Sequence, residues 1–116
     1  MTEAPAALPA SLAALGAWRC RPGAPRVAAE ELAQLLRLLP QWRPDGLGIV
    51  REFRFAGYDE TMAFVNALAW VARREDHHPE VRIYYRHCVV VFTTHDAGGV
   101  TRNDLACAAK AELLVA

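Results

Sequence analysis

The chain has 116 residues, of which 53% are apolar, and its 13 lysines and arginines balance 13 aspartates and glutamates. This length suits one domain with an ample core. The zero net charge argues against direct nucleic-acid binding, which favours a basic surplus. No apolar run approaches the roughly 20 residues of a membrane helix, and the first residues lack the basic start of a secretory signal. We therefore expect a cytoplasmic protein that contacts no membrane.

The three cysteines, Cys20, Cys88 and Cys107, are widely spaced in the sequence. Such spacing is typical neither of a disulfide framework nor of a CxxC metal knuckle. Cys88 and Cys107 lie in apolar patterns, which predicts that both are small buried side chains in a reduced, intracellular protein.

Residues 1–27 form a lead segment rich in alanine and proline. Ser11 to Trp18 predicts a short helix that stops near Gly16, and we expect Trp18 to anchor the segment onto the core. We place the domain proper at residues 28–116.

The first clear helix is predicted over residues 28–39, and Pro40 should end it. Gln41 to Arg43 predicts a short strand, Pro44 to Gly46 a turn, and Leu47 to Phe55 a second strand. Leucines at helical spacing define the helix: Leu32, Leu35, Leu36 and Leu39.

A second helix is predicted over about residues 60–74, with Asp59 as its N-cap. A strand follows from Val81 to Tyr85, then a turn at Arg86 and His87, then an apolar strand from Cys88 to Thr94.

Thr101 and Asp104 predict a capping box at the start of the last helix. The order α-β-β-α-β-β-α predicts an α+β domain, with a four-stranded antiparallel sheet and helices packed on one face.

The densest chemistry lies at Asp76-His77-His78-Pro79, and His95 follows 17 positions after His78. Histidine both donates and accepts protons near neutrality. Grouped imidazoles suit a reaction that takes a proton from one atom and gives a proton to another, such as the dehydration of a carbinolamine.

Two other interpretations of the histidines stay open. Two histidines before a proline are also typical of a solvated turn that ends a helix. Three histidines and a carboxylate also match a metal site in ligand type, although no pair shows the i, i+4 helical spacing. His87 is expected to be exposed, and Asp104 is expected to serve first as a capping residue.

These residues resemble a known family, the pterin-4a-carbinolamine dehydratases, also called dimerization cofactors of a homeodomain transcription factor. The family motif is His-His-Pro, five residues, an aromatic residue, nine residues, a histidine and later an aspartate. Here His77-His78-Pro79 is followed by Tyr85, His95 and Asp104. Leu39-Pro40-Gln41-Trp42 is similar to a Leu-Pro-Gly-Trp segment of the family.

The resemblance implies dehydration of 4a-hydroxytetrahydropterin to quinonoid dihydropterin, without a metal or an organic cofactor. This step regenerates the pterin used by aromatic amino-acid hydroxylases. The resemblance implies His77, His78 and His95 as the catalytic residues, with His77 and His95 as acid/base groups and His78 as a pterin ligand.

The resemblance further implies a substrate-binding set and two supporting carboxylates. The substrate-binding residues are Trp42, Asp76, Pro79, Thr93 and Thr94. The carboxylates behind them are Glu75 and Asp104.

A homodimer or homotetramer is implied, and a hydroxylase of the same pathway is a further implied partner. One departure is Arg73, which stands where many members carry a glutamate. That departure keeps a second hypothesis open, in which the chain is a non-catalytic pterin-binding or protein-interaction module, for example one related to molybdopterin. A metal-dependent hydrolase is the third hypothesis.

Overall fold

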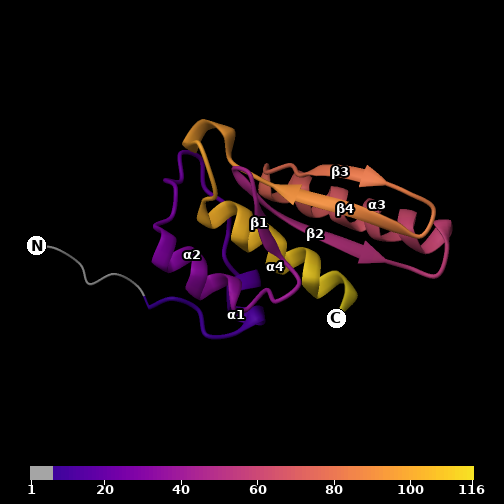
Figure 1. Ribbon diagram of the computed structural model, residues 1–116, viewed down its shortest axis with the longest axis horizontal. Coiled ribbons are helices and arrows are strands. Elements are labelled where there is room, and N and C mark those ends of the chain that lie inside the picture. Colours follow the sequence, from indigo (N-terminus) through magenta and orange to yellow (C-terminus); the bar gives the residue numbers. More distant parts are fainter. Residues whose placement is uncertain (1–6) are drawn as a thin grey trace, which may run out of the picture.

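The computed structural model describes residues 7–116, so the first six residues of the lead segment lie outside the described part. The elements follow one another along the chain in the colour order of Figure 1. They are α1 (Leu12–Gly16), α2 (Ala29–Leu36), β1 (Arg43–Asp45), β2 (Gly48–Arg54), α3 (Tyr58–Glu75), β3 (Glu80–Ile83), β4 (His87–Phe92), the 3₁₀ helix η1 (His95–Ala97) and α4 (Arg102–Val115).

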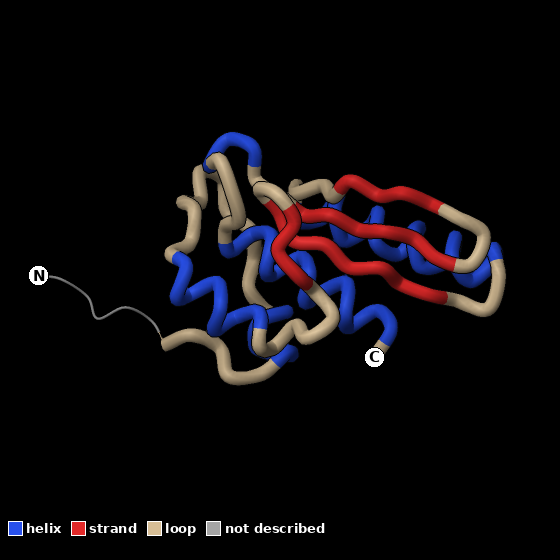
Figure 2. The backbone as a smooth tube through the Cα atoms, in the orientation of Figure 1, coloured by secondary structure: helices blue, strands red, loops and turns tan. Residues whose placement is uncertain are grey.

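The four strands form one antiparallel sheet in the order β1-β2-β4-β3. Helices α3 and α4 lie together on one face of this sheet (Figures 1 and 2). The α+β prediction, with its four-stranded antiparallel sheet, is therefore confirmed. Strand β4 occupies an interior position, where Cys88, Val90 and Phe92 are buried.

The first hairpin turns later than predicted. Pro44 and Asp45 belong to β1, where they pair with Ile49 and Gly48. The two residues of the turn are Gly46 and Leu47, and Gly46 has a φ of 59°. Glycine adopts this left-handed conformation at little cost, so it fixes the position of the turn and the register of the strands.

The second hairpin also differs from the prediction. His87 lies in β4 opposite Arg54, and Ile83 pairs with Cys88. The turn is therefore made by Tyr84, Tyr85 and Arg86. His87 is only half-buried and stacks on Tyr84, with 4.4 Å between the ring centroids.

Helix α2 ends at Leu36, and the predicted helix over residues 28–39 is too long. The amides of Leu38, Leu39 and Trp42 each donate to the carbonyl three residues earlier. The helix therefore ends before it reaches Pro40, and these tight turns carry Leu39 and Trp42 into the core. The N-cap of α3 is Gly57, and the helix proper begins at Tyr58. Asp59, the predicted N-cap, lies in the first turn.

The core lies between the sheet and the α3–α4 layer. Phe53 packs on Phe64 with 4.4 Å between ring centroids, and Leu68, Phe92 and Leu105 complete this layer. Each fully buried side chain of this size stabilises the fold by about 1.5–3 kcal/mol. The core fixes α3 and α4 against each other, and the residues that start α4 and end α3 are positioned with them.

The lead segment packs on the domain. Ser11 caps α1 by accepting from the Ala14 amide at 3.1 Å, as the sequence indicates. Leu15 is fully buried, and α1 contacts α4. Trp18 is half-buried, packs against the core and lies 4.8 Å below the guanidinium of Arg102.

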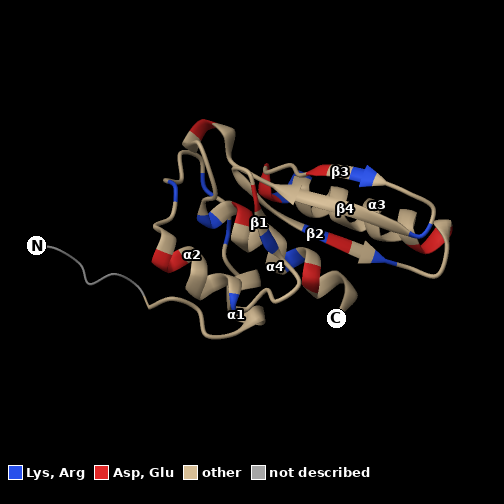
Figure 3. Ribbon diagram, viewed as in Figure 1, with Lys and Arg blue, Asp and Glu red and all other residues tan. Residues whose placement is uncertain are grey.

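Acidic and basic residues are intermixed along the ribbon in the view of Figure 3. Within residues 7–116, no helix combines the length and the apolar character that crossing a bilayer requires.

Candidate active site

The end of α3 directs the His-His-Pro element toward α4. Asp76 adopts φ 51° and ψ 44°, which is left-handed backbone. Aspartate tolerates this conformation better than most residues. The His77 amide then donates to the Ala72 carbonyl at 3.1 Å. These contacts end the helix and fix the direction in which the His77 side chain leaves the chain.

Asp104 is fully buried and holds three groups at once. Its Oδ1 accepts from His77 Nε2 at 2.6 Å. Its Oδ2 accepts from the Thr94 hydroxyl and from the Thr101 amide, each at 2.8 Å. The Thr101 contact belongs to the predicted capping box, which is confirmed. The carboxylate of the α4 capping box is thus also the partner of His77.

Asp104 determines the protonation of His77. Its hydrogen bond and its negative charge raise the pKa of His77 above the ordinary value, although burial acts in the opposite direction. The imidazole stacks on Phe92 at 6.0 Å between ring centroids and at 10° between planes. With Nε2 held by the carboxylate, Nδ1 is the nitrogen left to exchange a proton with a ligand.

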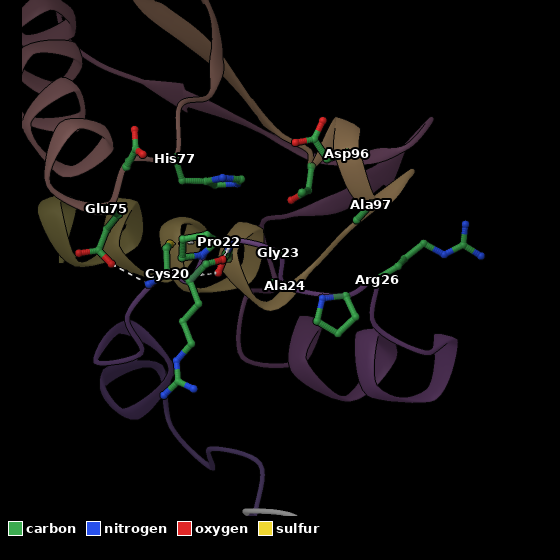
Figure 4. Close-up of a pocket in the computed structure, with 14 residues that line it drawn as sticks. Cys20, Pro22, Gly23, Ala24, Arg26, Glu75, His77, Asp96 and Ala97 are labelled. Carbon is green, nitrogen blue, oxygen red and sulfur yellow. Dashed lines mark hydrogen bonds between the residues drawn. The ribbon is translucent and has the colours of Figure 1, made fainter.

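An open cavity of about 510 Å³ lies against His77 (Figure 4). A volume of this size accommodates a small molecule. The lining residues come from the lead segment, the end of α3, the η1 region and the start of α4. They are Cys20, Arg21, Pro22, Gly23, Ala24, Pro25, Arg26, Glu75, Asp76, His77, Thr94, Asp96, Ala97 and Asn103.

Glu75 fixes the lead segment to the end of α3. Its side chain is 3% exposed, forms an ion pair with Arg19 and accepts from the Cys20 amide at 2.9 Å. Burial acts to raise the pKa of Glu75, but these hydrogen bonds and the charges of Lys110 and Arg19 hold it below its ordinary value. The carboxylate therefore stays ionised and keeps one wall of the cavity in place.

A second attachment of the lead segment comes from α4. The Arg21 amide donates to Asn103 Oδ1 at 2.9 Å, and Asn103 Nδ2 donates to the Arg21 carbonyl at 2.8 Å. The lead segment is therefore bonded at Cys20 to the end of α3, just before His77, and at Arg21 to the first turn of α4, next to Asp104.

The structure brings five of the predicted site residues together. Asp76, His77, Glu75 and Thr94 line the cavity, and Asp104 lies directly behind His77.

The other predicted site residues do not line this cavity. His78 and His95 are exposed, and Pro79 is half-buried. The Thr93 hydroxyl donates to the Leu47 carbonyl at 2.8 Å. Trp42 is buried in the core, where its indole N–H donates to Glu112 at 2.8 Å. Their roles toward a substrate stay predictions.

The contribution of the lead segment to the cavity was not predicted from the sequence. Cys20 to Arg26 supplies half of the cavity lining, whereas no part in the site was expected of residues 1–27. One available signal is the run Cys20-Arg21-Pro22-Gly23, because Pro22 restricts the backbone in an otherwise unassigned stretch. Asp96, Ala97 and Asn103 were also missed, since each is defined only by long-range packing.

Arg73 is exposed on α3, with its guanidinium 5.4 Å from the centre of the Trp70 ring. It does not line the cavity. Within the described range 7–116, no group of three or more histidine, cysteine, aspartate or glutamate side chains is placed so that it could hold a metal ion.

The histidine–aspartate pair lies on the wall of a cavity that is large enough for a small molecule. These are the features of a protein that binds a small molecule or of an enzyme that uses acid/base catalysis. The chain belongs to the family described as pterin 4 alpha carbinolamine dehydratase, whose model matches residues 25–114. This confirms the family that the His-His-Pro pattern indicated.

Two relatives support the assignment. A candidate pterin-4-alpha-carbinolamine dehydratase of Chromobacterium violaceum is 53% identical over 97 residues, which cover 82% of this chain and 90% of the relative. A second, from Nitrosospira multiformis, is 47% identical over 95 residues, covering 82% of this chain and 84% of the relative.

A solved structure has the same fold. It is described as a transcriptional coactivator/pterin dehydratase from Brucella melitensis, and it superposes with a TM-score of 0.75 at 32% identity. The match covers 78% of this chain and 99% of that chain.

Proposed function

We propose that the chain is a hydro-lyase that dehydrates 4a-hydroxytetrahydropterin to quinonoid dihydropterin by histidine acid/base catalysis. Membership of the dehydratase family supports the reaction class. In this role the protein would serve tetrahydropterin regeneration for aromatic amino-acid hydroxylation, and the reaction would need neither metal nor organic cofactor.

The observation that carries the proposal is the His77–Asp104 pair on the cavity wall. The reaction removes a hydroxyl from a ring carbon and a proton from the neighbouring ring nitrogen. A histidine whose pKa is raised above its ordinary value keeps its proton to a higher pH than a free imidazole does. His77 can therefore donate a proton from Nδ1 to the leaving hydroxyl, which departs as water, while Asp104 stabilises the imidazolium.

The second proton transfer needs another group. His95 is our proposed base for the ring N–H, and His78 is our proposed pterin ligand. Both are exposed next to elements that line the cavity: His78 follows His77, and His95 precedes Asp96. Trp42, Pro79 and Thr93 complete the proposed substrate-binding set, together with the cavity residues Asp76 and Thr94.

A direct assay tests the proposal. Purified protein should accelerate loss of the 4a-carbinolamine absorbance. The His77→Ala variant should lower the catalysed rate by about 10²–10⁴-fold. His87→Ala is the matched control, because His87 pairs with Glu52 and stacks on Tyr84 in the second hairpin. Equal rates in wild type and His77→Ala would refute the catalytic assignment.

One observation favours the alternative of a pterin-binding or protein-interaction module. The Brucella melitensis protein carries coactivator as well as dehydratase in its description. A thermal shift with dihydrobiopterin but no turnover in the carbinolamine assay would support a module that binds pterin without catalysis.

A homodimer or homotetramer, a hydroxylase partner and a cytoplasmic location stay part of the proposal. Light scattering of the purified chain distinguishes the two assemblies from each other and from a monomer.

A further inference from the structure

Two of the three cysteines touch each other beside the cavity. Cys20 Sγ and Cys107 Sγ lie 3.4 Å apart, which is about 1.4 Å more than a disulfide bond of about 2.0 Å. Cys20 is half-buried and lines the cavity, whereas Cys107 is fully buried within α4. Both thiols are free, and they are 87 positions apart in the chain.

The surroundings make the two thiols unequal. The hydrogen bond from Cys107 lowers the pKa of Cys20, burial opposes this effect, and the charge of His77 supports it. The same hydrogen bond and deep burial raise the pKa of Cys107, which stays a thiol. Burial also raises the pKa of Cys88, to about 11. The thiolate is the reactive form of cysteine, so Cys20 is the reactive one of the three.

We propose that Cys20 and Cys107 form a site of oxidative modification, which takes a small two-electron oxidant of the hydroperoxide class and closes a disulfide in the cavity wall. The cavity gives the oxidant access to Cys20, and the buried Cys107 sulfur is in contact to complete the bond. This inference is independent of the dehydratase activity, because it depends only on the two thiols and on the opening to solvent.

The chemistry balances in two steps. The Cys20 thiolate attacks one oxygen of hydrogen peroxide, the O–O bond breaks, and hydroxide leaves, so that Cys20 becomes a sulfenic acid. The Cys107 sulfur then attacks the Cys20 sulfur, the S–O bond breaks, and the Cys107 proton leaves with the hydroxyl as water. The two sulfur atoms together lose two electrons, and the peroxide gains them.

The disulfide would tighten an existing junction. The Cys20 amide donates to the Glu75 carboxylate. The Cys20 thiol donates to the Asn103 carbonyl at 3.6 Å. Closing the S–S bond draws this wall of the cavity toward α4, whose first turn contains Asp104. Oxidation therefore covalently links the lead segment to the element that holds His77.

The test is a thiol map of the full-length protein after treatment with hydrogen peroxide. The protein is denatured, alkylated without reductant and digested. We expect loss of alkylation at both Cys20 and Cys107, a cross-linked peptide that joins them, and recovery of both thiols with dithiothreitol. Cys88 should remain alkylated. A disulfide that includes Cys88 would overturn the proposal. Glutathione added to the same tube reports that the peroxide is active, so full alkylation of Cys20 and Cys107 while the glutathione is oxidised would also overturn it.

Two variants separate the steps. Cys107→Ser should stop at the sulfenic acid, which dimedone traps on Cys20. Cys20→Ser should leave Cys107 reduced, since the buried thiol has no reactive partner. Before oxidation, Cys20 should alkylate in the native protein at least ~10-fold faster than Cys88. If Cys88 alkylates as fast as Cys20, the assigned difference in reactivity is wrong.

Discussion

Helix α4 carries two carboxylates that each hold an aromatic ring nitrogen. Near its start, Asp104 accepts from His77 Nε2 at 2.6 Å. Near its end, Glu112 accepts from the Trp42 indole N–H at 2.8 Å and forms an ion pair with Arg51. The two arrangements use the same kind of hydrogen bond on the same helix.

They differ in what the ring can do. The Trp42 indole N–H does not titrate, and Trp42 is buried away from the cavity. His77 can gain and lose a proton, Asp104 raises its pKa above the ordinary value, and it lies on the cavity wall. A buried carboxylate bonded to a ring therefore becomes chemically useful only where the ring can exchange a proton and a ligand can reach it. Glu112, with Trp42 and Arg51, therefore has a structural hydrogen bond of the kind that Asp104 makes in the candidate site.

The largest expected effect comes from Asp104→Asn. The asparagine carbonyl can still accept from the Thr101 amide, while its amide group now donates to His77 Nε2. This selects the tautomer with the proton on Nδ1 and removes the charge that stabilises the imidazolium. We expect dehydratase turnover to fall by about 10²–10⁴-fold, as for other histidine–aspartate pairs.

Circular dichroism and Tm show whether Asp104→Asn still folds. A folded variant with wild-type turnover would contradict the role of Asp104.

The next effect is a pH dependence of turnover. If the His77 imidazolium is the acid, kcat should fall as pH rises through the raised pKa of His77, by about 10-fold per pH unit above it. The fall should move to lower pH in Asp104→Asn, because that variant removes the largest cause of the raised His77 pKa. An unchanged profile in this variant would show that another group provides the acid.

The control at the other end of α4 should change stability and leave chemistry alone. Glu112→Gln removes the charged partner of Arg51, whose side chain is 17% exposed. We expect a loss of about 1–2 kcal/mol in the free energy of unfolding by urea, with kcat unchanged. A raised KM would support the proposed contact of Trp42, which Glu112 orients, with the pterin, whereas a lowered kcat would contradict the structural role of Glu112.

The smallest effect concerns stability and pH. The pKa of His77 is raised in the folded state, so the charged pair with Asp104 contributes its full stability below the unfolded-state pKa of about 6.5. This contribution should disappear as pH rises through the raised pKa of folded His77. The urea midpoint of the wild type should exceed that of His77→Gln by more at pH 6 than at pH 8. The same difference between the two proteins at both pH values would contradict this contribution.

The fold was largely predictable because its signals are local. Leucine spacing, the capping box of Thr101 and Asp104 and the apolar β4 run each follow from a few neighbouring residues. The hairpin turns were displaced, because Gly46 and the pairing of His87 with Arg54 fix the register through contacts with other strands.

The site was predictable only in part. His77 and Asp104 were identified because the spacing of their motif carries over to this chain. The cavity wall from Cys20 to Arg26 was not, since it depends on Glu75 and Asn103, which are more than 50 positions away in the chain. Whether His78 and His95 face a substrate also depends on tertiary placement, which residue spacing does not encode.

The double use of Asp104 has a consequence for how the protein loses activity. The same buried carboxylate caps α4 and holds His77, so the first turn of α4 cannot fray while the site stays intact. In a urea titration, the loss of turnover should therefore coincide with global unfolding, without an earlier phase of inactivation. Amide hydrogen exchange at the first turn of α4 should be correspondingly slow, unlike that of an ordinary helix end.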